Sequence, residues 1–151
     1  MKKILLAVVL ILTSIIEINA QSYEFKVITS VESIVPMGLG RSRIISSDEE
    51  QNYQDFTSLR SKENKKQNKS KRGDVKIDQF EETKLVNFYS IAGINFKNIA
   101  SNDAIISSKI NSMITEGWDL AFVTSGVESD AGKGDGKGIF ITRFIFKRLK
   151  Q

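Results

Sequence analysis

One continuous stretch of the sequence predicts a helix and the strand that follows it: Ser101-Asn-Asp-Ala-Ile-Ile-Ser-Ser-Lys-Ile110-Asn-Ser-Met-Ile-Thr-Glu-Gly-Trp118-Asp-Leu-Ala-Phe122. Ser101 or Asn102 can cap the free N–H groups of a helix over residues 102–116. Gly117 suits the left-handed position that commonly follows a helix end. The apolar stripe expected on this helix consists of Ile106, Ile110, Met113 and Ile114.

Three segments around this helix show the alternation of a β-strand. Residues 118–125 and 138–148 form the clearest pair, and residues 23–31 predict a third strand with one solvated face. The last strand carries isoleucines on one face and phenylalanines on the other, which favours a central position or cover on both sides. Further strand material is expected in residues 85–91 and 93–96, whereas the weaker alternation in residues 43–45 and 75–77 decides nothing.

These elements predict an α+β fold. We expect an antiparallel sheet of about four to five strands, one main helix packed on a face, and a long, partly disordered insertion.

The order of elements resembles a small bacterial family catalogued as a domain of unknown function, in which a helix leads into a Glu-Gly-Trp-Glu-Leu strand. The residues that carry the resemblance are Tyr23-Glu-Phe-Lys-Val27, Glu116-Gly-Trp-Asp-Leu120 and Phe144-Ile-Phe-Lys-Arg148. The similarity covers residues 23–31 and 102–148 and leaves residues 35–101 as an insertion. It implies a β-α-β-β core and no catalytic residues.

The first twenty residues have the pattern of a cleavable signal peptide. Lys2 and Lys3 precede an apolar run over residues 4–16, and Ala20 stands before an expected cut at Gln21. An uncleaved anchor or a buried N-terminal helix is the alternative. We therefore expect an exported, periplasmic or secreted chain with one soluble domain over residues 21–151 and no transmembrane segment after cleavage. The sequence contains no cysteine, which excludes a lipid-bearing N-terminal cysteine and disulfide bonds.

The positive charge of the chain is concentrated in one segment. Beyond residue 20 there are 20 basic and 17 acidic residues, and residues 60–73 hold seven of the basic residues with Glu63 as their one acidic residue. These seven are Arg60, Lys62, Lys65, Lys66, Lys69, Lys71 and Arg72. A segment without apolar residues cannot offset the entropy of ordering, so a disordered loop is expected. It could contact an anionic lipid or glycan, or be a merely solvated insertion; nucleic acid is not expected as a partner.

The residue types in the chain narrow the chemistry that it can perform. Because histidine and cysteine are absent, Ser-His-Asp and Cys-His nucleophile systems and Cys/His zinc sites are excluded. No catalytic motif is recognisable, and we predict no enzyme activity, no cofactor and no metal site. Gly38 and Gly40, with Arg41 and Arg43, could form a loop that grips a phosphate or carboxylate. An ordinary turn with solvated arginines is the alternative.

The aromatic residues of the last strand are candidates for an interface. Phe140, Phe144 and Phe146 share one face, which would be exposed if the insertion does not cover it. Trp118 is expected in the core, at the junction of helix and strand. The sequence thus predicts a non-catalytic envelope domain that binds another protein or associates with itself. The alternative function is binding of a small anion or an anionic glycan through the loop from Gly38 to Arg43.

Overall fold

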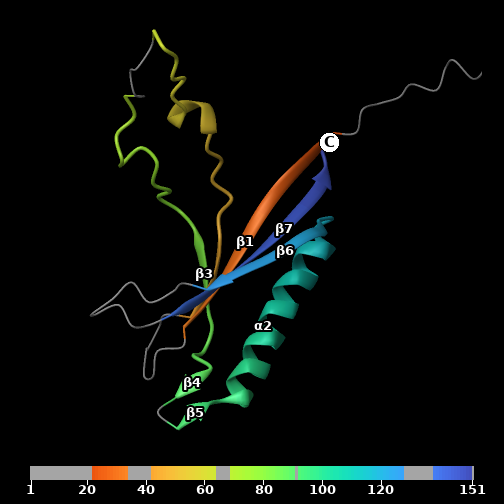
Figure 1. Cartoon of the computed structure of the whole chain (residues 1–151). Helices are drawn as coiled ribbons and strands as arrows, with labels where there is room; N and C mark the ends of the chain where they lie inside the picture. Colours follow the sequence, from red (N-terminus) through yellow and green to blue (C-terminus); the bar gives the residue numbers. More distant parts are fainter. Residues whose placement is uncertain (1–21, 34–41, 64–68, 91, 128–137, 151) are drawn as a thin grey trace, which may run out of the picture.

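The computed structural model describes residues 22–33, 42–63, 69–90, 92–127 and 138–150 (Figure 1). The predicted signal peptide lies outside these ranges. None of the helices within them has the length and apolar content needed to cross a bilayer. The elements follow one another as β1 (Tyr23–Ser33), β2 (Arg43–Ser46), the 3-10 helix η1 (Tyr53–Phe56), β3 (Glu81–Lys84), β4 (Tyr89–Ser90), β5 (Gly93–Ile94), α2 (Phe96–Thr115), β6 (Asp119–Val127) and β7 (Ile139–Leu149).

Five of the strands form one sheet in the order β3-β2-β1-β7-β6, with every neighbouring pair antiparallel. β7 pairs with β1 along its whole length and with β6 on its other side, which confirms the prediction of a central strand. The helix α2 packs on one face of this sheet (Figure 1). The α+β fold with one main helix on an antiparallel sheet is therefore confirmed.

The helix begins earlier than the sequence predicted. Asn95 is the N-cap, because its side-chain Oδ1 accepts hydrogen bonds from the backbone N–H groups of Lys97 and Asn98. The predicted caps, Ser101 and Asn102, both lie inside α2, so that expectation was wrong. Asn102 is instead fully buried and bonded to chain segments outside the helix.

The end of the helix is the one predicted from Gly117. This residue has a φ of +86°, and its N–H donates to the carbonyl of Ile114 at 3.0 Å. The N–H of Trp118 donates to the carbonyl of Met113, also at 3.0 Å. These two bonds form a Schellman motif, in which the side chains of Met113 and Trp118 meet in the core. The Glu116-Gly-Trp118 sequence therefore has a structural role at this turn.

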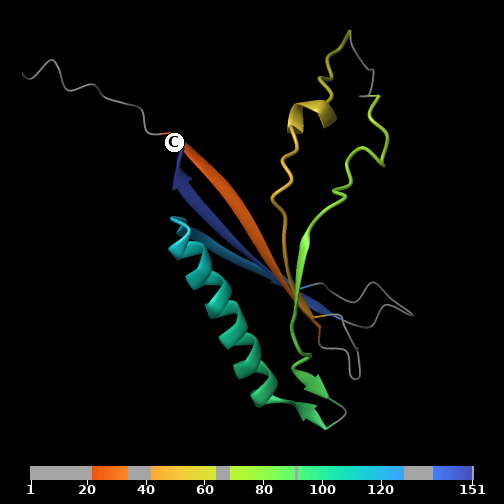
Figure 2. The same ribbon diagram turned by 180° about the vertical axis from the view of Figure 1, so that it is seen from behind.

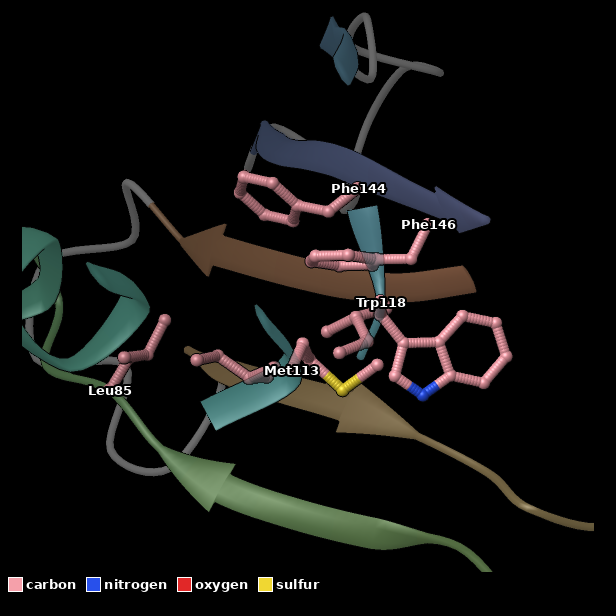
Figure 3. Packing of buried hydrophobic residues seen from close by; sticks show 7 residues of the cluster. Leu85, Met113, Trp118, Phe144 and Phe146 are labelled. Atoms are coloured by element: carbon pink, nitrogen blue, oxygen red, sulfur yellow. The ribbon is translucent and has the colours of Figure 1, made fainter. Parts of the chain in front are cut away.

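The core lies between α2 and the sheet. Figure 3 shows Phe144 and Phe146 of β7 with Met113 of α2 and Trp118 beside them. The complete set of buried apolar residues is Ile28, Ile44, Leu85, Met113, Trp118, Phe144 and Phe146, with Ile105, Ile106 and Ile110 packed against it. Ile114, which was expected in the apolar stripe, is 53% exposed and does not belong to this cluster.

The chain between β2 and β3 forms a long excursion, described over residues 47–63 and 69–80 and called here the arm. It leaves the sheet, carries η1, and returns as β3 (Figures 1 and 2). Residues 75–77 are not a strand, and of the strand material expected in residues 85–91 the structure assigns Tyr89–Ser90 alone, paired with Gly93–Ile94. The described parts of the basic segment, residues 60–63 and 69–73, lie in the arm and are exposed.

Candidate interaction surface

The two faces of the sheet differ in what covers them. In β1, Ile28 and Ser30 face α2 and are buried, whereas side chains at odd positions point to the opposite side because strand residues alternate. The opposite side is called here the open face; α2, the one α-helix within the described ranges, does not lie on it (Figures 1 and 2). The sheet therefore presents one covered face and one uncovered face.

The open face is apolar along a row across three strands. Val27 of β1 pairs with Ile145 of β7, and Ile145 pairs with Phe122 of β6. Residues directly opposite each other project from the same face, so these three side chains are neighbours. Phe25, two positions before Val27, adds a second aromatic ring, and Phe25 and Phe122 are 62% and 67% exposed. Two large aromatic side chains thus stand in solvent on the same surface.

Charged groups border this apolar row. At the β2–β3 side, Nη1 of Arg43 donates to Oε1 of Glu82 at 2.6 Å. At the other end of β1, the ammonium of Lys147 lies 5.1 Å from the ring centre of Tyr23. The open face thus carries an apolar row bordered by charged groups. One of these is Arg143 of β7, which lies opposite Thr29 and Thr124 on the same face. An apolar contact area with a polar border is the arrangement found in protein–protein interfaces.

The two edges of the sheet also differ. β3 is short, and its sequence, Glu81-Glu-Thr-Lys84, carries a charge at three of four positions. β6 is nine residues long and has no charged residue from Leu120 to Val127. A bulge between Leu120 and Phe122 interrupts its pairing with β7 near one end. The β3 edge therefore has the charges that discourage pairing with another strand, and most of the β6 edge lacks them.

Of the three predicted interface residues, Phe140 alone is exposed. Phe144 and Phe146 are buried beneath α2, at 9% and 0% exposure, so their assignment to an interface was wrong. The helix, rather than the insertion, covers them. Phe140 is 39% exposed and lies 5.7 Å from the ring centre of Phe88. The exposed aromatic residues on the open face were missed because alternation alone does not tell which face a helix will cover.

A hollow of about 760 Å³ lies between β1 and the start of the arm. Its charged side chains are largely paired with one another. Lys26 forms an ion pair with Asp48, and the hydrogen bond and positive charge of Lys26 lower the pKa of the Asp48 carboxyl. Arg148 binds Glu24, with Nη2 and Oε1 2.6 Å apart, and its guanidinium lies 4.2 Å from the ring centre of Trp118. These contacts join β1 to the start of the arm and to the end of β7.

One further carboxylate at this hollow, that of Glu49, supports the arm. Oε2 of Glu49 accepts hydrogen bonds from the backbone N–H groups of Asp78 and Gln79, at 3.1 and 3.2 Å, and so ties the two sides of the arm together. Within the described residues, no three acidic side chains are grouped so that they could hold a metal ion.

Of the four residues named for the predicted anion-binding loop, the structure describes Arg43 alone. Gly38, Gly40 and Arg41 lie outside the described residues. Arg43 lies on β2, where its guanidinium binds Glu82 as given above. An anionic ligand at Arg43 would have to compete with this carboxylate.

Comparison with known proteins identified no relative: no family model, no curated protein and no solved structure matches the chain.

Proposed function

We propose that the chain is an exported, non-catalytic binding domain that holds a protein partner through the open face of its sheet. The supporting observation is the apolar row on that face, in particular the two exposed rings of Phe25 and Phe122. Export is proposed from the signal-peptide pattern of the first twenty residues.

Uncovered aromatic rings supply binding energy when a partner excludes water from them. Aromatic side chains dominate the energy of protein interfaces because they bury a large area with few rotatable bonds. Phe25 and Phe122 stand on a rigid sheet whose central strands pair over their full length, so little ordering is required on binding. The paired charges at the border, Arg43 with Glu82, can stay hydrated when the apolar row is covered.

The test uses the mature domain, residues 21–151, in cells of its source. A photo-reactive phenylalanine analogue replaces Phe25, and cross-linked proteins are identified by mass spectrometry. We expect one stoichiometric partner. The same probe at Ser107, on the exposed side of α2, is the matched control and should give background only.

A second measurement separates loss of binding from loss of folding. The variant Phe25→Ser should retain the circular dichroism spectrum of the wild type and lose the partner in a pull-down. Ile114→Ser, which removes a similarly exposed apolar side chain from α2, should keep it. If the pull-down recovers the same partner from Phe25→Ser as from the wild type, the open face is not the binding surface.

A further inference from the structure

The difference between the two edges of the sheet indicates a second interaction surface, at the exposed edge of β6. An edge strand exposes unpaired backbone N–H and C=O groups and readily pairs with another strand unless charges, proline or bulges prevent it. β6 is nine residues long, carries no charge after Asp119, and has exposed apolar side chains on both faces, including Phe122 and Val123. Within the described residues, no strand pairs with β6 on the side away from β7.

We propose that β6 pairs antiparallel with β6 of a second copy of this chain, about a two-fold axis at Thr124. This inference goes beyond the proposed function, because it needs the unpaired backbone of the β6 edge and, of the apolar row, the ring of Phe122 alone.

The choice of a second copy rests on the self-complementary pattern of β6. Phe122 and Gly126 lie on the open face, where they pair with Ile145 and Ile141 of β7. A side chain built at Gly126 would meet no atom within 4 Å, so open space lies beside this glycine. A two-fold axis at Thr124 sets each Phe122 opposite Gly126 of the other copy, where the ring fills that space. Aromatic residues facing glycine across strands are a known stabilising pair in sheets.

The same axis brings no like charges together. Residues 121–127 of one copy face residues 127–121 of the other, and none of them is charged. The bulge between Leu120 and Phe122 lies at one end of this segment and leaves the pairing from Phe122 to Gly126 undisturbed.

The resulting assembly has one continuous sheet of ten strands. A two-fold axis perpendicular to the sheet keeps both α2 helices on one side and joins the two open faces on the other. About seven residues of each β6 strand take part. An interface of this size buries less area than the interface of a permanent dimer, so the fraction of dimer should depend on protein concentration.

The test measures self-association of residues 21–151 by sedimentation velocity over the micromolar to millimolar range. Thr124 is exposed and lies opposite itself in the proposed dimer. Thr124→Lys should weaken the dimer at least ~10-fold, because two like charges then face each other. Thr124→Glu should weaken it less, because Arg143 lies directly opposite Thr124 on β7 and offsets the negative charge. An equimolar mixture of the two variants should form a heterodimer, and added salt should weaken it.

The control substitutions are Thr83→Lys and Thr83→Glu, at an exposed threonine in the opposite edge strand, which should not change the wild-type equilibrium. Thermal unfolding of each variant checks that it is folded. A wild type that is monomeric throughout the range, or a dimer insensitive to Thr124→Lys, overturns the proposal. Two variants distinguish a failure of this proposal from a failure of the proposed function. Phe25→Ser should abolish partner binding and leave the dimer intact. Thr124→Lys should weaken the dimer and leave partner binding intact.

Discussion

Asn102 joins the helix to two separate segments of the chain, and its removal should destabilise the fold substantially. Its Nδ2 donates to Oε1 of Glu32 and to the carbonyl of Val86, both at 2.8 Å, and its Oδ1 accepts from the N–H of Val86 at 2.9 Å. The residue is fully buried. These bonds hold the segment after β3 and the end of β1 against α2.

The magnitude follows from these three bonds. The two bonds to the Val86 backbone are each worth ~0.5–1.5 kcal/mol, and the bond to the charged Glu32 is worth ~1.5–3 kcal/mol. Because Val86 is 44% exposed, its freed backbone groups can bond to water in the variant, which recovers part of the lost stability. We expect Asn102→Ala to lower the free energy of unfolding by about 2–4 kcal/mol, and the melting temperature by roughly 10 °C.

The assay is urea and thermal unfolding of residues 21–151, followed by circular dichroism. Asn102→Asp should cost more than Asn102→Ala at neutral pH, because a carboxylate would replace the two donor bonds and stand beside Glu32. Asn111→Ala, at an exposed position of the same helix, is the control and should change stability by less than ~0.5 kcal/mol. A loss below ~1 kcal/mol for Asn102→Ala would refute the argument that this side chain anchors the helix.

Two further predictions concern the helix end and the ion pairs. Gly117→Ala should lower the free energy of unfolding by about 1–2 kcal/mol, because alanine strains the left-handed backbone at φ +86°. The added methyl group meets only an ordinary van der Waals contact, so the cost comes from the backbone. An unchanged urea midpoint would contradict this prediction. Hydrogen bonds from Lys109 and Ser46 lower the pKa of Glu81 from 4.5, so the stability they contribute is present above that pH and is lost as the pH falls through the lower folded-state value. The melting temperature should therefore fall further between about pH 6 and about pH 2 in the wild type than in Glu81→Gln. The difference should be small, because Glu81 is exposed. Parallel curves of melting temperature against pH for the two proteins would contradict this prediction.

The sequence alone predicted the elements whose structure depends on residues close together in the chain. Gly117 predicts the helix end because only glycine adopts a positive φ without strain, and the bonds that complete the turn join residues three to five positions apart. The alternation in residues 23–31 and 138–148 predicts β1 and β7 because the period of a strand is set by its own backbone. The distribution of phenylalanine and isoleucine on opposite faces of β7 was correct for the same reason.

The tertiary structure decided the features that depend on residues far apart in the sequence. Asn102 resembled a helix cap, but its partners Glu32 and Val86 lie 70 and 16 positions away and draw it into the interior of a longer helix. Phe144 and Phe146 face α2, so they form the core, while Phe25 and Phe122 lie on the uncovered side. The sequence by itself determined the three strands β1, β6 and β7, the helix end, and the absence of histidine and cysteine. The packing of α2 decided which of two apolar faces is buried, because both faces satisfy the same alternation.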